Sequence, residues 1–310
     1  MKRKLQLLIA LIAIVALAIP AGAITSGEPD GEEHPYVGQL FFYVPDDFDS
    51  RFDDPGSWFN CSGTLISPTV VVTAGHCTFA VGLDGVSTTE GGGDGNGGND
   101  VWLSFSEVPD YDGINPSGAY DRDENQQRYD DRVEWIESND DWIRGTAQSH
   151  PAYDNDAFFL YDLGIVVLGE PVDTGGQFGE LPDEGYIDTF FAQRKNDQRF
   201  TPVGYGLKRI NPVKIEFGDE RYKADVMLVN TTGVFGIPAG TSVTFSNNNG
   251  KAHKGGTCFG DSGGPVFEAG TSTIAAITSF GINGNCAGTG GGYRIDKAAD
   301  LGFINSFLGD

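Results

Sequence analysis

The sequence has few cations, few sulfur-containing residues and few long apolar segments. Lys and Arg number 20 against 44 Asp and Glu, which gives a formal net charge of −24 at pH 7. An excess of this size repels phosphate backbones and anionic lipid surfaces, so nucleic acid and membrane surfaces are excluded as partners of the mature chain. The 4 histidines and 4 cysteines form no H-E-x-x-H or paired C-x-x-C pattern. No metal site is therefore predicted from these residues.

The long apolar run at the N-terminus has the three parts of a secretory signal peptide. Lys2, Arg3 and Lys4 precede an apolar stretch from 5 to 19, and Ala21-Gly22-Ala23 follows it. The stretch is shorter than the roughly 20 residues that cross a bilayer, so a retained anchor is the weaker alternative. We predict that residues 1–23 are removed, that the protein is secreted to the extracellular medium, and that Ile24 becomes its first residue.

Three local sequences place a histidine, an aspartate and a serine where nucleophilic catalysis could use them. His76 lies in TAGHC after an apolar run, and Asp162 is the second residue of YDLGIVVL, where it opens a run with the apolar character of a buried strand. Ser262 lies in GTCFGDSGGP, whose small residues allow a sharp turn around one hydroxyl. A serine hydroxyl needs a base as it attacks, and an imidazole that titrates near neutral pH is suited to that role.

The same serine also satisfies the G-x-S-x-G pattern of the α/β-hydrolases. That fold needs its histidine after the serine in the chain. All four histidines, His34, His76, His150 and His253, precede Ser262. The chain order therefore argues against this alternative.

The ordered set of His76, Asp162 and Ser262 resembles the chymotrypsin and trypsin family of secreted serine peptidases. The resemblance implies that His76 is the general base, that Asp162 orients its ring, and that Ser262 is the nucleophile. It also implies an oxyanion hole made by the backbone N–H groups of Gly260 and Ser262. This chemistry requires no metal and no other cofactor.

The resemblance further implies an all-β fold of two chymotrypsin-like six-stranded β-barrels, with the active site between them and a helix at the C-terminus. We expect an N-terminal barrel over 24–175, with a long insertion at about 80–140, and a second barrel with the terminal helix over 176–310. Short apolar or alternating runs predict strands. These are 36–43, 63–66, 69–73, 101–105, 162–168, 200–205, 224–229 and 272–280. Apolar residues at helical spacing predict the helix over 297–308.

The insertion contains a glycine-rich acidic segment, 91–100, followed by a charged and aromatic stretch. A solvated loop is the favoured interpretation of the segment. Its Asp and Asn oxygens could hold calcium, although they match no EF-hand spacing.

Four cysteines in a secreted chain predict two disulfides with three possible pairings. The resemblance implies the pairs Cys61–Cys77 and Cys258–Cys286. It also implies that the α-ammonium group of a freed Ile24 pairs with Asp261 and thereby orders the oxyanion hole and the substrate pocket. Cleavage by signal peptidase would then complete activation, which favours a bacterial or archaeal source.

The resemblance places the substrate pocket at Gly256, Ser279, Phe280, Gly281 and Gly291. Trypsin-like members have an aspartate where this chain has Gly256, so cleavage after Arg or Lys is not expected. Glycine walls predict an open slot for a large apolar or aromatic residue.

The sequence therefore predicts a secreted, monomeric serine endopeptidase that acts on proteins or peptides through an acyl-enzyme. Two alternatives remain open. A catalytically inactive binding module would keep the fold, and an esterase of small substrates would share every catalytic residue.

Overall fold

The computed structural model describes residues 24–44, 57–82, 99–111, 125–192, 198–211, 214–216, 218–232, 236–248 and 255–309. The predicted signal peptide, most of the segment 91–100 and His253 lie outside these residues. In the described part of the chain, no helix is both long enough and apolar enough to cross a membrane.

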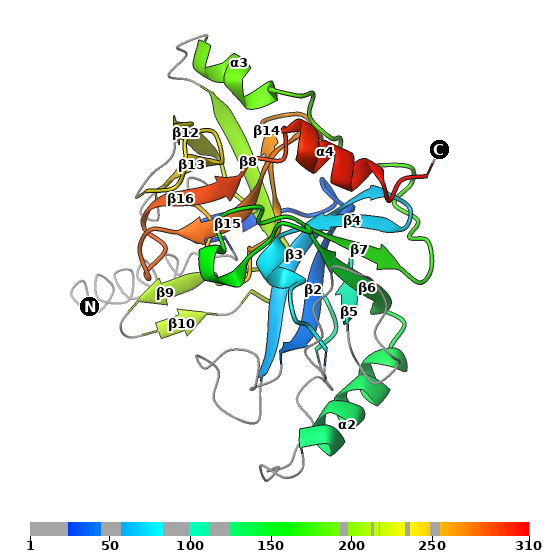
Figure 1. Ribbon diagram of the computed structural model, residues 1–310. Helices are drawn as coiled ribbons and strands as arrows, with labels where there is room; N and C mark the ends of the chain where they lie inside the picture. The colour runs from blue at the N-terminus through cyan, green and yellow to red at the C-terminus, as the bar shows by residue number, and fades with distance from the viewer. Residues whose placement is uncertain are drawn as a thin grey trace, which may run out of the picture.

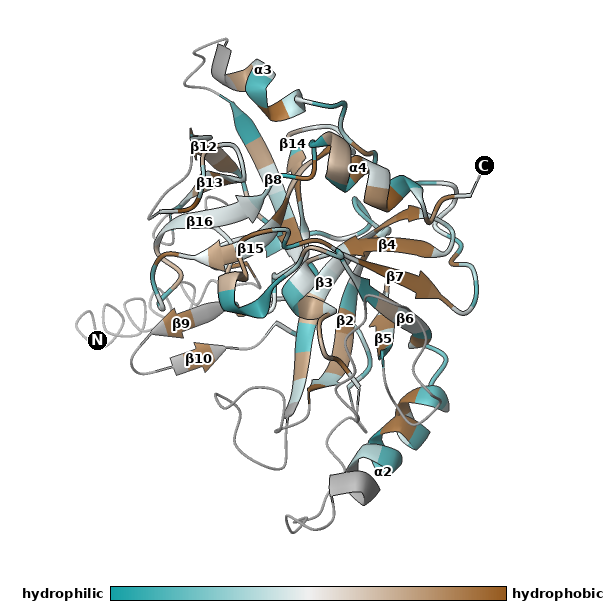
Figure 2. Ribbon diagram, viewed as in Figure 1, coloured by the Kyte–Doolittle hydropathy of each residue, from teal (hydrophilic) through white to brown (hydrophobic). Residues whose placement is uncertain are grey.

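The first barrel is a closed antiparallel sheet in the strand order β2-β3-β4-β7-β6-β5 (Figure 1). Its strands are β2 (Val37–Val44), β3 (Ser57–Ser67), β4 (Val70–Thr73), β5 (Asp100–Ser104), β6 (Ile143–Ser149) and β7 (Gly164–Leu168). Apolar side chains of β4 and β7 fill the interior, and both strands are strongly hydrophobic in Figure 2. β4 pairs with β7 in the register Val72 to Ile165 and Thr73 to Gly164, which fixes where each strand ends.

The second barrel closes because β8 pairs with β14 as well as with β12. Its strands are β8 (Arg199–Gly204), β12 (Val226–Asn230), β13 (Ser242–Asn247), β14 (Pro265–Glu268), β15 (Ile274–Gly281) and β16 (Gly288–Tyr293). The short strands β1 (Glu28–Pro29) and β11 (Tyr222–Lys223) extend this sheet from β8, and β9 (Arg209–Asn211) pairs with β10 (Lys214–Glu216). The fold is thus the expected pair of six-stranded barrels.

Each of the eight predicted strand segments overlaps an observed strand, but four barrel strands were not predicted. These are β6, β13, β14 and β16. Polar residues and glycines dominate the sequences of β6, β13 and β16, as in GTGGGY of β16, and β14 has only the four residues PVFE, so the apolar pattern is missing or too short. Their positions follow from pairing with neighbours, such as the six register pairs between β13 and β16.

The C-terminal helix α4 (Ala298–Asn305) confirms the predicted helix, and it buries Ile304 against the main core. The described residues contain two other α-helices that were not predicted, α2 (Asn125–Glu137) and α3 (Tyr186–Ala192). Helix α2 belongs to the insertion and lies beside the first barrel (Figure 1). Its Tyr129 and Ile136 complete a cluster with aromatic side chains of the barrel strands, including Phe41, Tyr43 and Trp102.

Candidate active site

His76 and Asp162 are brought together by the paired ends of β4 and β7. His76 lies in a 3-10 turn, Gly75–Cys77, directly after β4, and Asp162 lies just before β7. Asp162 Oδ1 accepts a hydrogen bond from the backbone N–H of His76 at 2.9 Å. The ring nitrogen Nδ1 of His76 lies 3.0 Å from Oδ1 and 2.9 Å from Oδ2 of the same carboxylate. The imidazole is therefore held through both its backbone and its ring.

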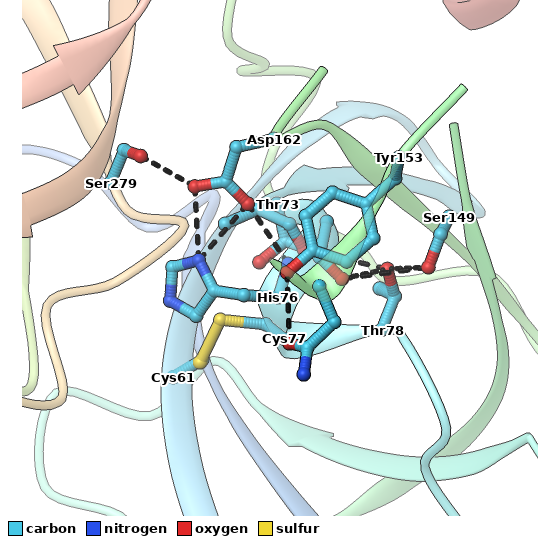
Figure 3. Close-up of polar contacts among 12 residues, drawn as sticks. Cys61, Thr73, His76, Cys77, Thr78, Ser149, Tyr153, Asp162 and Ser279 are labelled. Atoms are coloured by element: carbon cyan, nitrogen blue, oxygen red, sulfur yellow. Dashed lines mark hydrogen bonds and ion pairs between the residues drawn. A yellow bond between two sulfur atoms is a disulfide. The ribbon is translucent and has the colours of Figure 1, made fainter. Parts of the chain in front are cut away.

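A third donor reaches the Asp162 carboxylate from the second barrel. The hydroxyl of Ser279, near the end of β15, donates to Asp162 Oδ2 at 2.5 Å (Figure 3). Sequence reasoning placed Ser279 in the pocket wall and missed this bond, for which the local sequence gives no signal. The bond crosses from one barrel to the other, so it couples the geometry of His76 to the position of β15.

The electrostatics favour a basic His76. Burial opposes the charged imidazolium, but the charge of Asp162 and its hydrogen bond outweigh burial and raise the pKa of His76 above its ordinary value. Asp162 itself is fully buried. A carboxylate with three donors in this position fixes the ring tautomer, so that Nδ1 carries the proton and Nε2 is left as the proton acceptor.

The disulfide Cys61–Cys77 braces the turn that carries His76, as the resemblance implied. Ligand atoms of Cys61, His76 and Cys77 lie within 4.8 Å of one another. Because the two sulfurs are bonded to each other, neither is available as a thiolate, and this group does not fit a metal site.

Ser262 is positioned by a loop that is bound to both barrels. Its carbonyl oxygen accepts from the N–H of Ser62 on β3 at 2.7 Å. The next two residues, Gly263 and Gly264, exchange backbone hydrogen bonds with Thr278 on β15. Gly263 has φ +77°, and an added Cβ would overlap Thr73 at the end of β4, so only glycine fits here. The Ser262 loop is thus hydrogen-bonded to β3 of the first barrel and to β15, the strand that carries Ser279.

The predicted oxyanion donors are available in the structure. The N–H groups of Gly260 and Ser262 donate to none of the residues that the structure describes. Gly260 has φ +96°, a conformation that favours glycine. Its carbonyl oxygen accepts from the Ser62 hydroxyl at 3.0 Å, which fixes the peptide group on one side.

Asp261 is fully buried, and the structure pairs it with backbone groups. Its two carboxylate oxygens accept from the N–H groups of Gly206 and Cys258, each at 2.8 Å. Burial raises its pKa to about 7 despite these bonds. Ile24 is also buried, against Tyr222 and Ala224, but here its nitrogen is in the peptide bond to Ala23. The Ile24–Asp261 ion pair stays a prediction for the cleaved chain.

The space beside the predicted pocket glycines is occupied. The second disulfide, Cys258–Cys286, joins the two walls. An added Cβ on Gly256 would overlap the side-chain oxygen of Asn247, and one on Gly291 would overlap the ring of Phe280. The open slot expected from glycine walls is therefore not present in this form of the chain. Asn247, at the end of β13, was missed because it lies in an unpredicted strand.

Comparisons with known proteins agree with this fold. A model of the Trypsin family matches residues 123–300, a range that contains Asp162 and Ser262. HL collagenase matches with a TM-score of 0.59 and 17% identity, over 92% of this chain and 98% of that chain. Human heparin binding protein matches with a TM-score of 0.51 and 18% identity, over 91% and 93% of the two chains. No curated protein sequence matches this chain. At such identities the solved structures establish the fold alone.

Proposed function

The chain belongs to the trypsin family, and on this basis we propose that it is a secreted serine endopeptidase that works through His76, Asp162 and Ser262. The observation that carries the proposal is the buried Asp162 carboxylate, which binds Nδ1 of His76 on one side and the Ser279 hydroxyl on the other. The histidine ring is fixed in this way, and in the serine loop the N–H groups of Gly260 and Ser262 donate to no residue that the structure describes.

The reaction would proceed in two halves. Ser262 Oγ attacks the carbonyl carbon of the substrate while its proton moves to Nε2 of His76, and the oxyanion that forms accepts from the N–H groups of Gly260 and Ser262. The imidazolium then gives this proton to the leaving amine as the C–N bond breaks, which leaves an ester on Ser262. A water molecule repeats these steps on the ester and frees the carboxylic acid and the serine. His76 and Asp162 end in their starting protonation states, so no cofactor is consumed.

The buried, unpaired charge site at Asp261 supports the proposal that removal of residues 1–23 activates the enzyme. Without a cation nearby, burial raises the pKa of this carboxyl group and favours its uncharged, protonated form. A freed Ile24 would bring an α-ammonium group, and pairing with Asp261 would stabilise the charged form of both groups. To form this pair the freed N-terminus would have to move to Asp261, and this would rearrange the loop that contains Gly260 and Ser262.

The proposed cleavage preference is not trypsin-like. The predicted pocket residues Gly256, Ser279, Phe280, Gly281 and Gly291, together with Asn247, include no acid that could neutralise Arg or Lys. Phe280 supplies an aromatic wall beside Gly291. We expect large apolar or aromatic residues on the acyl side of the cut bond, a monomeric enzyme, and protein or peptide substrates. A metal analysis of the pure protein would test whether the segment 91–100 binds calcium.

The test is labelling of the secreted protein with a fluorophosphonate probe, followed by mass spectrometry. One adduct on Ser262, absent in Ser262→Ala, on a chain that begins at Ile24 supports the whole proposal. An adduct on a chain that begins elsewhere contradicts the activation step alone. A chain that begins at Ile24 and forms no adduct is an inactive binding module.

One assay and one property of the sequence separate the endopeptidase from the remaining alternatives, an esterase and a binding module. Casein digestion distinguishes an endopeptidase from an esterase, which would act only on activated esters. One structural neighbour is named for binding heparin, but the net charge of −24 on this chain disfavours a polyanionic ligand.

A further inference from the structure

His150 contacts the chain on both sides of Asp162. Its backbone N–H donates to the carbonyl oxygen of Leu163 at 2.8 Å, where β6 ends and β7 begins. Its ring stacks on the ring of Tyr161, with 5.0 Å between the ring centroids and 9° between the ring planes. The residue before Asp162 and the residue after it are therefore both held by His150.

The backbone at Tyr161 has a conformation that needs support from its surroundings. Its φ is +52°, in the left-handed region that a bulky residue rarely adopts. The N–H of Leu163 donates to the carbonyl oxygen of Tyr161 at 2.7 Å, which closes a three-residue turn with Asp162 at its centre. Such a conformation costs free energy and persists only where neighbouring contacts hold it. Because Tyr161 is 42% exposed, the stack on His150 is a main part of this support.

The ring of His150 is itself held in one orientation. Its Nδ1 accepts from the N–H of Ala152 at 3.1 Å. Burial lowers the pKa of His150, so the ring is neutral at pH 7 and carries its proton on Nε2. The ring of Phe303, on α4, meets it edge to face at a centroid distance of 5.0 Å, and Nε2 lies 3.9 Å from Oδ1 of Asp300 on the same helix. The C-terminal helix thus packs against the ring that stacks on Tyr161.

We propose that His150 is a positioning residue for Asp162: through its stack on Tyr161 and its bond to Leu163 it fixes the turn that carries the carboxylate, and so it fixes the ring of His76. The Asp162 carboxylate binds both the backbone N–H and Nδ1 of His76. A shift of the turn would therefore be passed directly to the imidazole. The importance of His150 for the reaction rests on the proposed peptidase function, but its effect on the His76–Asp162 pair does not.

The first experiment separates the ring of His150 from its imidazole chemistry. His150→Ala removes the stack and should lower kcat by about tenfold to a hundredfold with KM close to wild type, because a small displacement of a catalytic group has an effect of that size. His150→Phe keeps an aromatic ring that can stack on Tyr161, so it should recover most of kcat. Tyr129→Ala is the control for the loss of a buried ring, because it belongs to the cluster under α2, and it should leave kcat unaltered. A wild-type kcat in folded His150→Ala would overturn the proposal.

The second experiment approaches the stack from its other side. Tyr161→Asn removes the ring but places there a residue that tolerates positive φ, so the backbone can keep its conformation. We expect kcat to fall by about as much as in His150→Ala. The double variant should be no slower than either single variant, because both substitutions remove the same contact. Losses that multiply in the double variant would show that the two residues act independently, which contradicts the proposal.

A measurement without substrate tests the same positioning. In a Ser262→Ala background, NMR titration of the ring protons gives the pKa of His76. Because Asp162 raises this pKa, it should fall in His150→Ala and in Tyr161→Asn, where the carboxylate is less well placed. It should keep its wild-type value in His150→Phe and in the control Tyr129→Ala.

Fluorophosphonate labelling of wild-type Ser262 separates the possible failures. If wild type is labelled but the pKa of His76 is the same in every variant, the role of His150 is refuted while the peptidase function stands. If wild type is not labelled but the pKa falls as expected, the peptidase function fails and the positioning of Asp162 by His150 stands. If His150→Ala does not fold, Tyr161→Asn, at the more exposed residue of the stack, decides.

Discussion

The chain that retains residues ahead of Ile24 should lose stability as the pH rises from about 4 to about 7, because of Asp261. This carboxyl group is fully buried and has only the N–H groups of Gly206 and Cys258 as partners. Burial raises its pKa to about 7 in the folded chain, against an ordinary value of 3.8. Between these values the unfolded chain is ionised while the folded chain keeps the proton. Since the folded state binds more protons, its stability falls as the pH rises.

The size of the effect follows from the two pKa values. A pKa of about 7 against 3.8 corresponds to about 4 kcal/mol of stability, which is fully present below pH 3.8 and fully lost above pH 7. This is a large part of the 5 to 15 kcal/mol that stabilises a typical domain. Freeing Ile24 should remove most of it, because an α-ammonium group beside Asp261 favours the ionised carboxylate and lowers its pKa.

The assay is urea unfolding at pH 4.5 and pH 7.5 in a Ser262→Ala background, which prevents self-digestion. Two chains are compared, one beginning at Ile24 and one that retains residues 21–23, each with and without Asp261→Asn. Asp300, whose pKa burial raises to about 6, contributes in the same direction to every chain and cancels in the comparison. If the extended chain and its Asp261→Asn variant lose the same stability between the two pH values, Asp261 does not carry the effect. If the two starting points behave alike, the Ile24 ion pair is absent.

Four further outcomes are expected from the contacts described. Asp162 raises the pKa of His76 and catalysis needs the neutral ring, so kcat/KM should rise with pH with a midpoint above 6.5. In Asp162→Asn this midpoint should fall, and kcat should fall by about 10⁴. Ser279→Ala removes a hydrogen bond to the buried Asp162 carboxylate and should lower kcat/KM at least about tenfold. An unchanged rate and pH–rate profile would show that Asp162 does not need the Ser279 hydroxyl. Replacing both Cys258 and Cys286 with Ser should cost about 4 kcal/mol in urea unfolding, against about 3 kcal/mol for the shorter Cys61–Cys77 loop, so the opposite order would contradict the loop-entropy explanation. Tyr129→Ala should destabilise the chain by about 3 kcal/mol through the aromatic cluster under α2 but leave kcat unchanged, and a fall in kcat at constant stability would place α2 in the catalytic machinery.

The parts of the fold that the sequence predicts are those in which local pattern and burial coincide. Val70–Thr73 begins with three valines and is buried throughout, so its strand was recognised from composition. Gly288–Tyr293 is as regular a strand, but it contains four glycines, and its side chains give no alternating pattern. Its burial comes from its neighbours, since the Phe245 and Phe280 rings occupy the space beside Gly292 and Gly291. A pattern that depends on partners far along the chain cannot be recognised from one segment.

The candidate site divides in the same way. His76, Asp162 and Ser262 stand in distinctive local sequences, and the structure brings the first two into contact across 86 residues. Ser279 was expected in the pocket wall, but nothing in its flanking residues marks its bond to Asp162, and Asn247 lies in a strand that was not predicted. Ser279 reaches Asp162 across 117 residues because the β15 strand that holds the Ser262 loop ends beside the His76 turn. Asn247 reaches the pocket because Gly256 and Gly290 leave room for its amide. The glycines that suggested an empty pocket are therefore the space that admits the amide of Asn247, a side chain that lies outside every motif.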